Sequence, residues 1–430
     1  MERVDLLTAF NREVEVLELN DEYMIYALDQ KNELKDLCSI EKMDFSDRQV
    51  QRLISLDYTR LWESFRTYGQ LPGFFYAVNV LQDYRVRLRR INKQTWENDT
   101  DFLIQPEGEI INIYSLNEDY MVITDEVKAS PDVYETYHMI DEGRRYVNVR
   151  YLYEIATAKK YPIVDSHFDS LTEELPVRQM NGVPTLIYEA FYRDEAEENA
   201  GGMSAILSVS VDAFIAHVKA DGLAGFKVLA MAGEDDFAYV RLMSAADDCI
   251  VYRRRKIELA PVEDGELRTE VGCHTEAGAG CGGENDGDLR ALCNALMEQQ
   301  VVLHGEADGS FTREICCEYR IPEMGSLHYD KETMDVYHCP DGEDAETKHI
   351  ICLNRPEISL AYEGKYGDFC KLWQDELLVT TYFDEVFVKE YEYHEYSAIH
   401  DLKSGVVDTI EGRTEASGQT LVLLRSFLAL

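Results

Sequence analysis

The sequence lacks the short motifs that identify the commonest enzyme folds. It contains no Walker-type phosphate loop, no glycine fingerprint of a dinucleotide-binding fold, no nucleophile elbow and no zincin helix. These absences remove nucleotide-dependent reactions and the classical serine and zinc hydrolases from the leading candidates. We therefore expect no obligatory cofactor.

Basic residues are scarce. The chain has 42 Lys and Arg against 82 Asp and Glu, a formal net charge of −40. Such a charge repels phosphate backbones and anionic membrane surfaces, so neither a nucleic acid nor a membrane is an expected partner. It favours a basic protein or peptide as partner, although acidity can also serve solubility alone.

Long apolar runs are absent as well. No stretch approaches the roughly 18 apolar residues of a membrane helix. The first 19 residues carry acids among their apolar positions, unlike the uninterrupted core of a secretory signal. Ten cysteines in a long chain without a leader are best interpreted as reduced thiols. The sequence therefore predicts a cytoplasmic protein.

What the chain does contain is a repeated β-hairpin pattern, clearest at Tyr396–Ile410. Alternating apolar residues enter a polar turn at Asp401–Gly405 and leave as a second apolar run. The same plan recurs less regularly at Tyr23–Leu37, Tyr84–Asp99, Tyr151–Val164, Met203–Val218, Ile250–Arg268 and Ser326–Cys339. The first turn residues lie at 29, 92, 156, 212, 261, 330 and 401, a mean spacing of about 62.

Further pairs of strand-like runs precede several hairpins, at Glu109–Asp125, Phe226–Leu242 and Phe369–Phe383. Four antiparallel strands per unit, repeated about seven times, is the plan of a β-propeller. In strand pattern and spacing the units resemble generic blades of the WD-repeat and TolB-like propeller superfamilies, with the signature of no specific family. The resemblance implies one all-β, seven-bladed propeller domain over residues 1–430.

The C-terminal run at residues 420–428 is expected to pair into the first blade and close the ring, with an amphipathic terminal helix as the alternative. Two stacked β domains joined near residues 165–185 are the alternative to a single propeller. Residues 262–306 are expected to be a rim insertion, with a glycine-rich loop at Ala277–Gly283 and a helix at Asp286–Val302. A short helix at Asp47–Leu53, capped by Ser46, is also expected.

Several clusters could carry chemistry. Cys273, His274, Cys281 and Cys293 are potential zinc ligands, but their irregular spacing favours free thiols, and we assign no metal ligand. Neighbouring Cys316 and Cys317 are interpreted as strand residues. His304 begins an incomplete deaminase-like motif, whose downstream cysteines are missing.

Charged and titratable residues of the repeats form a second group of candidates. If His338, His349, His394 and His400 met at one rim, a neighbouring acid would suit acid–base catalysis, but strand histidines are more often structural. Acidic turns follow Asn117, Glu234 and Gln374, and Asn285–Asp288 is interpreted as a turn and helix cap. Two basic clusters could bind an anion or pair with acids on adjacent strands: Arg85, Arg87, Arg89, Arg90 and Lys93, and Arg253, Arg254, Arg255 and Lys256.

No catalytic residue can be named from these patterns. The leading expectation is a non-catalytic binding or scaffold protein that holds a protein or peptide on a propeller rim or in its channel. The alternative is a propeller hydrolase or lyase acting on a carbohydrate or lactone, because carboxylate pairs depend on separations that no sequence spacing reveals.

Overall fold

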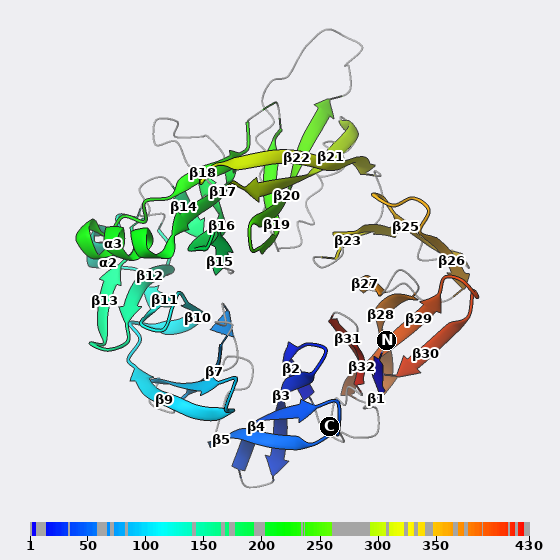
Figure 1. Cartoon of the computed structure of the whole chain (residues 1–430), viewed down its shortest axis with the longest axis horizontal. Helices are drawn as coiled ribbons and strands as arrows, with labels where there is room; N and C mark the ends of the chain where they lie inside the picture. The colour runs from blue at the N-terminus through cyan, green and yellow to red at the C-terminus, as the bar shows by residue number, and fades with distance from the viewer. Residues whose placement is uncertain are drawn as a thin grey trace. The chain divides into compact units, whose positions relative to one another are not determined.

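The structure is a computed structural model in which β-strands predominate (Figure 1). It describes residues 2–5, 14–32, 35–57, 67–68, 73–81, 85–139, 143–164, 168–171, 177–192, 203–233, 235, 237–259, 293–306, 309–321, 326–330, 334–339, 347–363, 369–373, 377–388, 390–411, 413–417 and 420–424. Within these ranges the only helices are α2 (Pro131–Tyr137) and α3 (Val211–Asp221). Neither described helix has the length and apolar character needed to cross a membrane.

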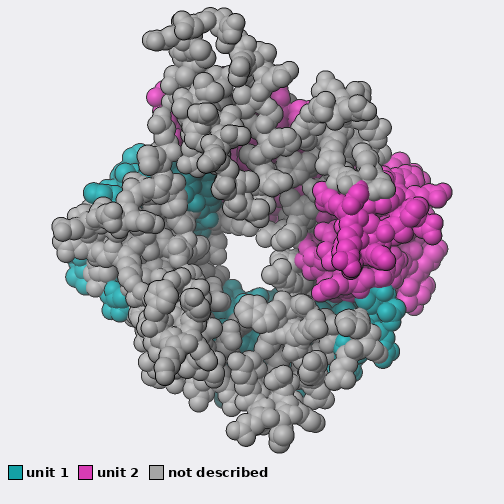
Figure 2. Space-filling view, turned by 180° about the vertical axis from the view of Figure 1, so that it is seen from behind, with its two compact units in different colours: residues 1–106, 326–430 teal, residues 107–325 magenta. Residues whose placement is uncertain are grey.

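The chain divides into two compact units (Figure 2). Unit 1 is discontinuous and combines residues 1–106 with 326–430, whereas unit 2 is the continuous segment 107–325.

Unit 1 is built from successive antiparallel sheets. Two four-stranded sheets of the order β23-β24-β25-β26 and β27-β28-β29-β30 follow residue 325, and β2-β3-β4-β5 and β7-β8-β9 come before residue 107. The first half contains β2 (Val14–Leu19), β3 (Tyr23–Asn32), β4 (Lys35–Asp44), β5 (Val50–Asp57), β6 (Thr67–Tyr68), β7 (Phe74–Val80), β8 (Val86–Asn92) and β9 (Glu97–Ile104). The second half contains β23 (Ser326–Tyr329), β24 (Val336–Cys339), β25 (Thr347–Cys352), β26 (Ser359–Glu363), β27 (Phe369–Trp373), β28 (Leu377–Val388), β29 (Glu390–Asp401) and β30 (Val407–Glu411).

Both ends of the chain lie in one further sheet of unit 1. Strand β32 (Thr420–Leu424) pairs in parallel with β1 (Glu2–Asp5) and antiparallel with β31 (Arg413–Ser417). Val422 of β32 is buried among Met24, Tyr26, Met43 and Phe45. The described part of the C-terminal run is therefore a strand that packs on the first sheet, while its hydrogen bonds go to β1 and β31.

Unit 2 holds three sheets. Their orders are β13-β12-β11-β10, β14-β16-β17-β18 with β15 also paired to β16, and β19-β20-β21-β22. Their strands are β10 (Glu109–Ser115), β11 (Tyr120–Lys128), β12 (Tyr146–Glu154), β13 (Lys159–Pro162), β14 (Phe168–Leu171), β15 (Val177–Met180), β16 (Val183–Tyr192), β17 (Met203–Ser210), β18 (Lys227–Met231), β19 (Tyr239–Ala246), β20 (Cys249–Leu259), β21 (Cys293–Gly305) and β22 (Phe311–Ile321).

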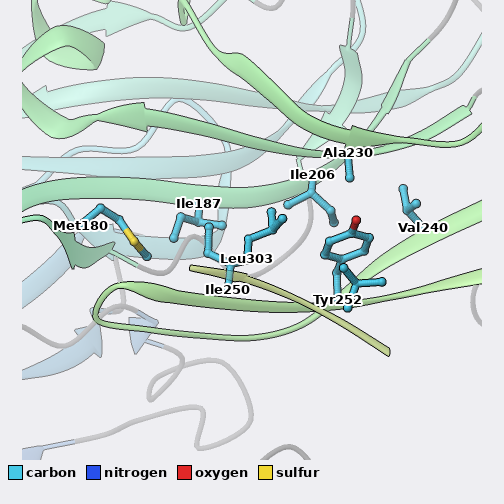
Figure 3. Close-up of a cluster of buried hydrophobic side chains, with 9 residues drawn as sticks. Met180, Ile187, Ile206, Ala230, Val240, Ile250, Tyr252 and Leu303 are labelled. Atoms are coloured by element: carbon cyan, nitrogen blue, oxygen red, sulfur yellow. The ribbon is translucent and has the colours of Figure 1, made fainter. Parts of the chain in front are cut away.

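The core of unit 2 is formed where apolar faces of neighbouring sheets meet. Ile187 and Ile206 from one sheet pack with Ile250, Tyr252 and Leu303 from the next (Figure 3). Burial of such aliphatic and aromatic side chains is the main favourable contribution to folding.

A fully buried tyrosine is a recurring feature of the sheets. The residue directly before each of these tyrosines in the sequence is apolar, as in Met24-Ile25-Tyr26 and Phe74-Phe75-Tyr76. The six tyrosines of this kind are Tyr26, Tyr76, Tyr114, Tyr188, Tyr252 and Tyr337, each at most 1% exposed.

The prediction of a helix at Asp286–Val302 is wrong for the part of this range that the structure describes. Cys293–Gly305 is strand β21, hydrogen-bonded to β20 on one side and β22 on the other. Glu298, Gln300, Val301 and Leu303 of this strand are buried, whereas Met297, Gln299 and Val302 are half-buried and His304 is exposed. The buried series changes phase at the bulge between Gln300 and Val301 and two of its members are polar, so the sequence shows no regular alternation of apolar residues. The glycine-rich stretch 277–283 lies outside the described residues.

Two smaller expectations also fail. The hairpin at Met203–Val218 is instead β17 followed by helix α3. The Ser210 hydroxyl caps this helix by accepting a hydrogen bond from the Ala213 amide over 3.3 Å. The helix at 47–53 is instead a turn leading into β5, where the Asp47 carboxylate accepts from the Gln49 amide over 2.9 Å. The first prediction took a capped helix for the turn of a hairpin, and the second took a turn for a capped helix.

The clearest hairpin prediction is confirmed. Strands β29 and β30 are antiparallel, and the Asp401 carboxylate accepts hydrogen bonds from the Lys403 and Ser404 amides at 2.8 and 2.9 Å. Gly405 has φ of 71°, the left-handed conformation that the turn requires.

Candidate functional site

Four carboxylates, all at most 7% exposed, accept a hydrogen bond from a buried tyrosine, and one of the four differs from the rest. In three of these contacts an arginine also binds the carboxylate: Tyr26 with Glu41 and Arg52, Tyr319 with Glu298 and Arg255, and Tyr337 with Asp335 and Arg355. In the fourth contact, between Tyr151 and Asp125, no arginine or lysine of the described residues lies within ion-pair distance of the carboxylate. Burial of a carboxylate without a counter-charge is costly, so this exception calls for a functional explanation.

Asp125 lies near the end of β11, an interior strand of its sheet. It is directly opposite Val149 of β12, and Tyr151 lies two residues further along that strand on the same face. The two side chains are therefore diagonal neighbours, and the Tyr151 hydroxyl donates to Oδ2 of Asp125 over 3.0 Å. The backbone amide of Glu107 donates to the same oxygen over 2.6 Å.

The other carboxylate oxygen of Asp125, Oδ1, is buried and has no hydrogen-bond partner. Asp125 as a whole is 0% exposed. Burial raises the pKa of Asp125, and this rise is opposed only in part by the backbone amides of Glu107 and Gly108, the Tyr151 hydroxyl and the charge of Lys160. The carboxyl therefore keeps its proton to a higher pH than an ordinary aspartic acid.

Tyr151 is a donor over a wide pH range. Burial raises its pKa, and the nearby charge of Asp125 raises it further. The ammonium group of Lys160, on the neighbouring strand β13, lies 4.6 Å from the centre of the Tyr151 ring. Tyr151 therefore fixes Oδ2 as an acceptor rather than acting as a base.

A second layer surrounds these residues on the same side of the sheet. Helix α2 packs through Tyr137 against Val127, Val147 and Val149, which share the face of Asp125. The Tyr137 hydroxyl donates to Oε2 of Glu107 over 3.0 Å, and Lys160 Nζ lies 3.7 Å from Oε1 of the same carboxylate. We call the five residues Asp125, Tyr151, Glu107, Tyr137 and Lys160 the Asp125 centre.

The arrangement is suited to proton donation. Because Oδ2 already accepts two hydrogen bonds, the proton of the neutral carboxyl belongs on Oδ1, where no protein acceptor competes for it. A carboxylic acid kept neutral by burial is a common form of general acid.

None of the candidates from sequence forms such a site. Cys273, His274, Cys281 and the turn 285–288 lie outside the described residues, as does the turn after Gln374. His304 contacts Glu314 over 3.1 Å on the exposed side of its sheet, and the Cys317 thiol contacts the side-chain oxygen of Gln300 over 3.2 Å. No group of three or more His, Cys, Asp or Glu side chains gathers at metal-binding distance in the part of the chain that is described.

In the described part of the chain, no cluster of three or more His, Cys, Asp or Glu side chains includes His338, His349 or His400. His338 is 5% and His400 1% exposed, whereas His349 is exposed on β25. Nothing is described of the His394 side chain. Burial lowers the pKa of His400 to about 4, so it is neutral at physiological pH.

The basic clusters pair with acids, in agreement with the structural interpretation. In unit 1, Arg87 contacts Asp101 and Arg90 contacts Asp99 at 2.9 Å. In unit 2, Arg254 contacts Asp235 at 3.0 Å, and Arg253 and Arg255 contact Glu298 at 3.5 and 2.9 Å. These arginines neutralise acids of the fold instead of forming an anion site.

The Asp125 centre was missed because no motif marks it. Its signal is an aspartate that interrupts the apolar strand Tyr120–Lys128, with a Pro-Glu-Gly turn upstream at residues 106–108. A single acid in a strand is not specific without knowledge of what faces it.

The sequence matches no protein-family model and no curated protein. Among solved structures it resembles an oligogalacturonate lyase from Vibrio parahaemolyticus, with 10% identity, TM-score 0.37 and coverage of 94% of this chain and 86% of the other. An ulvan lyase is similar at 10% identity and TM-score 0.37, covering 83% of this chain and 84% of its own. The β-propeller domain of the trilobed protease from Pyrococcus furiosus is similar at 8% identity and TM-score 0.39, covering 93% and 97%.

The predicted fold class is confirmed. The chain is all-β and consists largely of four-stranded antiparallel sheets, and its structural neighbours are β-propeller proteins. The number of seven blades stays a prediction.

The expectation of a non-catalytic scaffold protein is wrong by the same comparison. The neighbours are enzymes or an enzyme's propeller domain, which agrees with the alternative of a propeller hydrolase or lyase. What each neighbour acts on is a property of that protein.

Proposed function

We propose that this chain is an enzyme that cleaves a carbohydrate or a lactone, with Asp125 as its general acid. The observation that supports this function is the Oδ1 atom of Asp125, a buried carboxyl oxygen without a hydrogen-bond partner, next to an Oδ2 atom that two donors hold in place.

The chemistry needs one proton at one oxygen. When the glycosidic or lactone C–O bond breaks, the departing oxygen takes the Oδ1 proton and leaves as a hydroxyl group, while Asp125 becomes a carboxylate. In hydrolysis, water forms the new bond to the carbon and its proton passes to solvent; in elimination, an adjacent C–H proton passes to solvent and a C=C bond forms. The Tyr151 hydroxyl, which belongs to β12, then stabilises the new charge at Oδ2. The donor that positions the acid thus stabilises its conjugate base.

A substrate screen with matched variants tests the proposal. Neutral, amino-bearing and uronate glycans and small lactones are incubated with the protein, and reducing ends, unsaturated products and ring opening are measured. We expect turnover of at least one class and a loss of roughly 100-fold or more in kcat for Asp125→Asn. Glu126→Gln is the control, because this exposed neighbour on β11 points to the opposite face. No turnover in any class, or full activity of Asp125→Asn, would overturn the proposal.

The pH profile supplies a second readout. A general acid must be protonated, so kcat should fall as pH rises through the raised pKa of Asp125. Burial places this fall above the ordinary range of aspartic acid. Tyr151→Phe removes a donor that favours the carboxylate and should shift the fall to still higher pH.

The remaining expectations belong to the same proposal. They are a single propeller domain of seven blades over residues 1–430 and a cytoplasmic location, which is supported by the free thiols of the described Cys249, Cys316, Cys317 and Cys352. A basic protein or peptide partner and the absence of nucleic-acid and membrane binding stay predictions from the net charge of −40.

A further inference from the structure

The Asp125 centre poses a problem of access. Asp125 is 0% exposed, yet a general acid must come within hydrogen-bond reach of the bond that it protonates. Part of the protein must therefore move away from the carboxyl before a substrate can reach it. The contacts of Asp125 show which part this is.

The cover nearest to the carboxyl is the turn at Glu107 and Gly108, which precedes β10. The Glu107 amide donates directly to Oδ2 over 2.6 Å. Gly108 approaches β11 so closely that a Cβ atom there would lie 2.1 Å from the Glu126 carbonyl oxygen and 3.0 Å from Cγ1 of Val127. Only glycine permits this approach, so the turn is fitted closely over the acid.

The Glu107 side chain holds this turn in place. One of its oxygens accepts the Tyr137 hydroxyl at 3.0 Å and the other lies 3.7 Å from Lys160 Nζ. Tyr137 ends helix α2 and Lys160 belongs to β13, so two separate elements fix a single side chain. Glu107 and Lys160 have side-chain exposures of 39% and 24%, and a contact of this kind at the surface breaks more readily than the buried contacts beneath it.

We propose that Glu107 is a positioning residue that latches the 107–108 turn over Asp125, and that release of Glu107 by Tyr137 and Lys160 opens the acid to substrate. This inference rests on the proposed function for its catalytic meaning. The movement itself can be measured without any substrate. Closure of short loops over catalytic groups is a common way of excluding water from a site.

The test measures how accessible Asp125 is in the full chain. A hydrophobic carbodiimide labels protonated carboxyls, and mass spectrometry of peptides reports the labelling rate at Asp125 together with amide hydrogen exchange at residues 107–108. We expect Tyr137→Phe and Glu107→Gln each to raise both rates roughly five- to tenfold, the factor expected from one lost hydrogen bond. Glu135→Gln, an exposed change on the same helix, is the control and should leave both rates unchanged.

The two variants protect the test against simple misfolding. Tyr137→Phe keeps the aromatic ring that packs on the valines, and Glu107→Gln keeps the backbone amide that binds Asp125. Unchanged labelling and exchange in both variants would overturn the latch, whatever their activity. The opposite combination, faster labelling in an enzyme whose Asp125→Asn variant retains full activity, would leave the latch intact and remove the proposed function.

If both proposals hold, the pH profile of kcat distinguishes a positioning role of Glu107 from a purely structural one, which would leave the profile unchanged. Glu107→Gln should alter the pH at which kcat falls, because the opened turn admits water to Asp125 and returns its pKa toward the ordinary value. Glu135→Gln should leave that profile in place.

Discussion

Asp125 in unit 2 and Asp335 in unit 1 are two buried aspartates that accept a hydrogen bond from a tyrosine, and they differ in one partner. Asp335 is 1% exposed and binds Arg355 through both carboxylate oxygens, with Nε of the arginine 2.7 Å from Oδ1. Asp125 is equally buried and has no arginine. The difference teaches that a tyrosine alone does not make a buried acid structural. A counter-charge does so, and where the arginine is missing burial raises the pKa of the acid.

The largest effect is expected from removing the arginine of the unit 1 pair. Arg355→Ala leaves Asp335 as a buried carboxylate without its cation, which should lower the free energy of unfolding by about 4 kcal/mol. Urea unfolding at neutral pH measures this change. Arg355→Lys keeps the charge but loses the planar fork, and should recover part of the loss. A loss below about 0.5 kcal/mol for the alanine variant would mean that Asp335 needs no counter-charge.

A buried histidine in unit 1, His400, shows how burial without a counter-charge affects the stability of the fold as the pH is lowered. The pKa of His400 is lowered by burial to about 4 from 6.5, so its neutral form stabilises the fold at neutral pH. This stability is complete above pH 6.5 and is lost as pH falls toward 4, by at most about 3 kcal/mol. The difference in unfolding free energy between wild type and His400→Gln, followed over this range, should show it. A difference that does not vary with pH would contradict the lowered pKa.

The fit of the turn over Asp125 gives the next effect. Gly108→Ala places a Cβ atom 2.1 Å from a backbone oxygen, so the turn must shift. We expect a loss of about 2 kcal/mol in unfolding free energy together with faster labelling of Asp125. Gly73→Ala is the matched control, because no atom lies within 4 Å of the added Cβ. Equal stabilities of the two variants would show that the turn is loosely packed.

The smallest effect is expected from an exposed ion pair. Arg87 and Asp101 have side-chain exposures of 39% and 31% and are joined by hydrogen bonds of 2.9 and 3.0 Å from Nε. Arg87→Ala should cost less than about 1 kcal/mol and should become neutral at high salt. Chemical unfolding at two ionic strengths tests this against Arg355→Ala. If Arg87→Ala lowered the unfolding free energy as much as Arg355→Ala does, and salt did not change that loss, burial would not explain the difference between the two ion pairs.

The sequence was sufficient for features that depend on local chemistry. The turn at Asp401–Gly405 was predictable because one carboxylate and one glycine determine its backbone. The same local rules failed for Cys293–Gly305, where a bulge between Gln300 and Val301 shifts the alternation and two of the buried side chains, Glu298 and Gln300, are polar. A repeated signal was overlooked, namely the apolar residue followed by tyrosine that recurs from Tyr26 to Tyr337.

The candidate site was beyond local reasoning for a different reason. Its character depends on which partners are missing around Asp125, and Asp335, just before β24, also accepts a hydrogen bond from a tyrosine. Whether Arg355 or only Lys160 comes near is decided by the packing of segments that are distant in the sequence. Absence of a partner leaves no mark in a single sequence.

The pairing of β1 with β32 bears on how the protein is made. Unit 2 is a continuous segment, so all of it is synthesised before residues 326–430, the second half of unit 1. Unit 1 joins residues 2–5 to residues 420–424, and β1 therefore waits until every residue between them has been synthesised. During that interval β1 and the apolar side chains that pack on Val422 lack this strand as a neighbour and are open to chaperones and other nascent chains. The protein is thus most vulnerable to misassembly before residues 420–424 emerge, and deletion of that strand would make the vulnerability permanent.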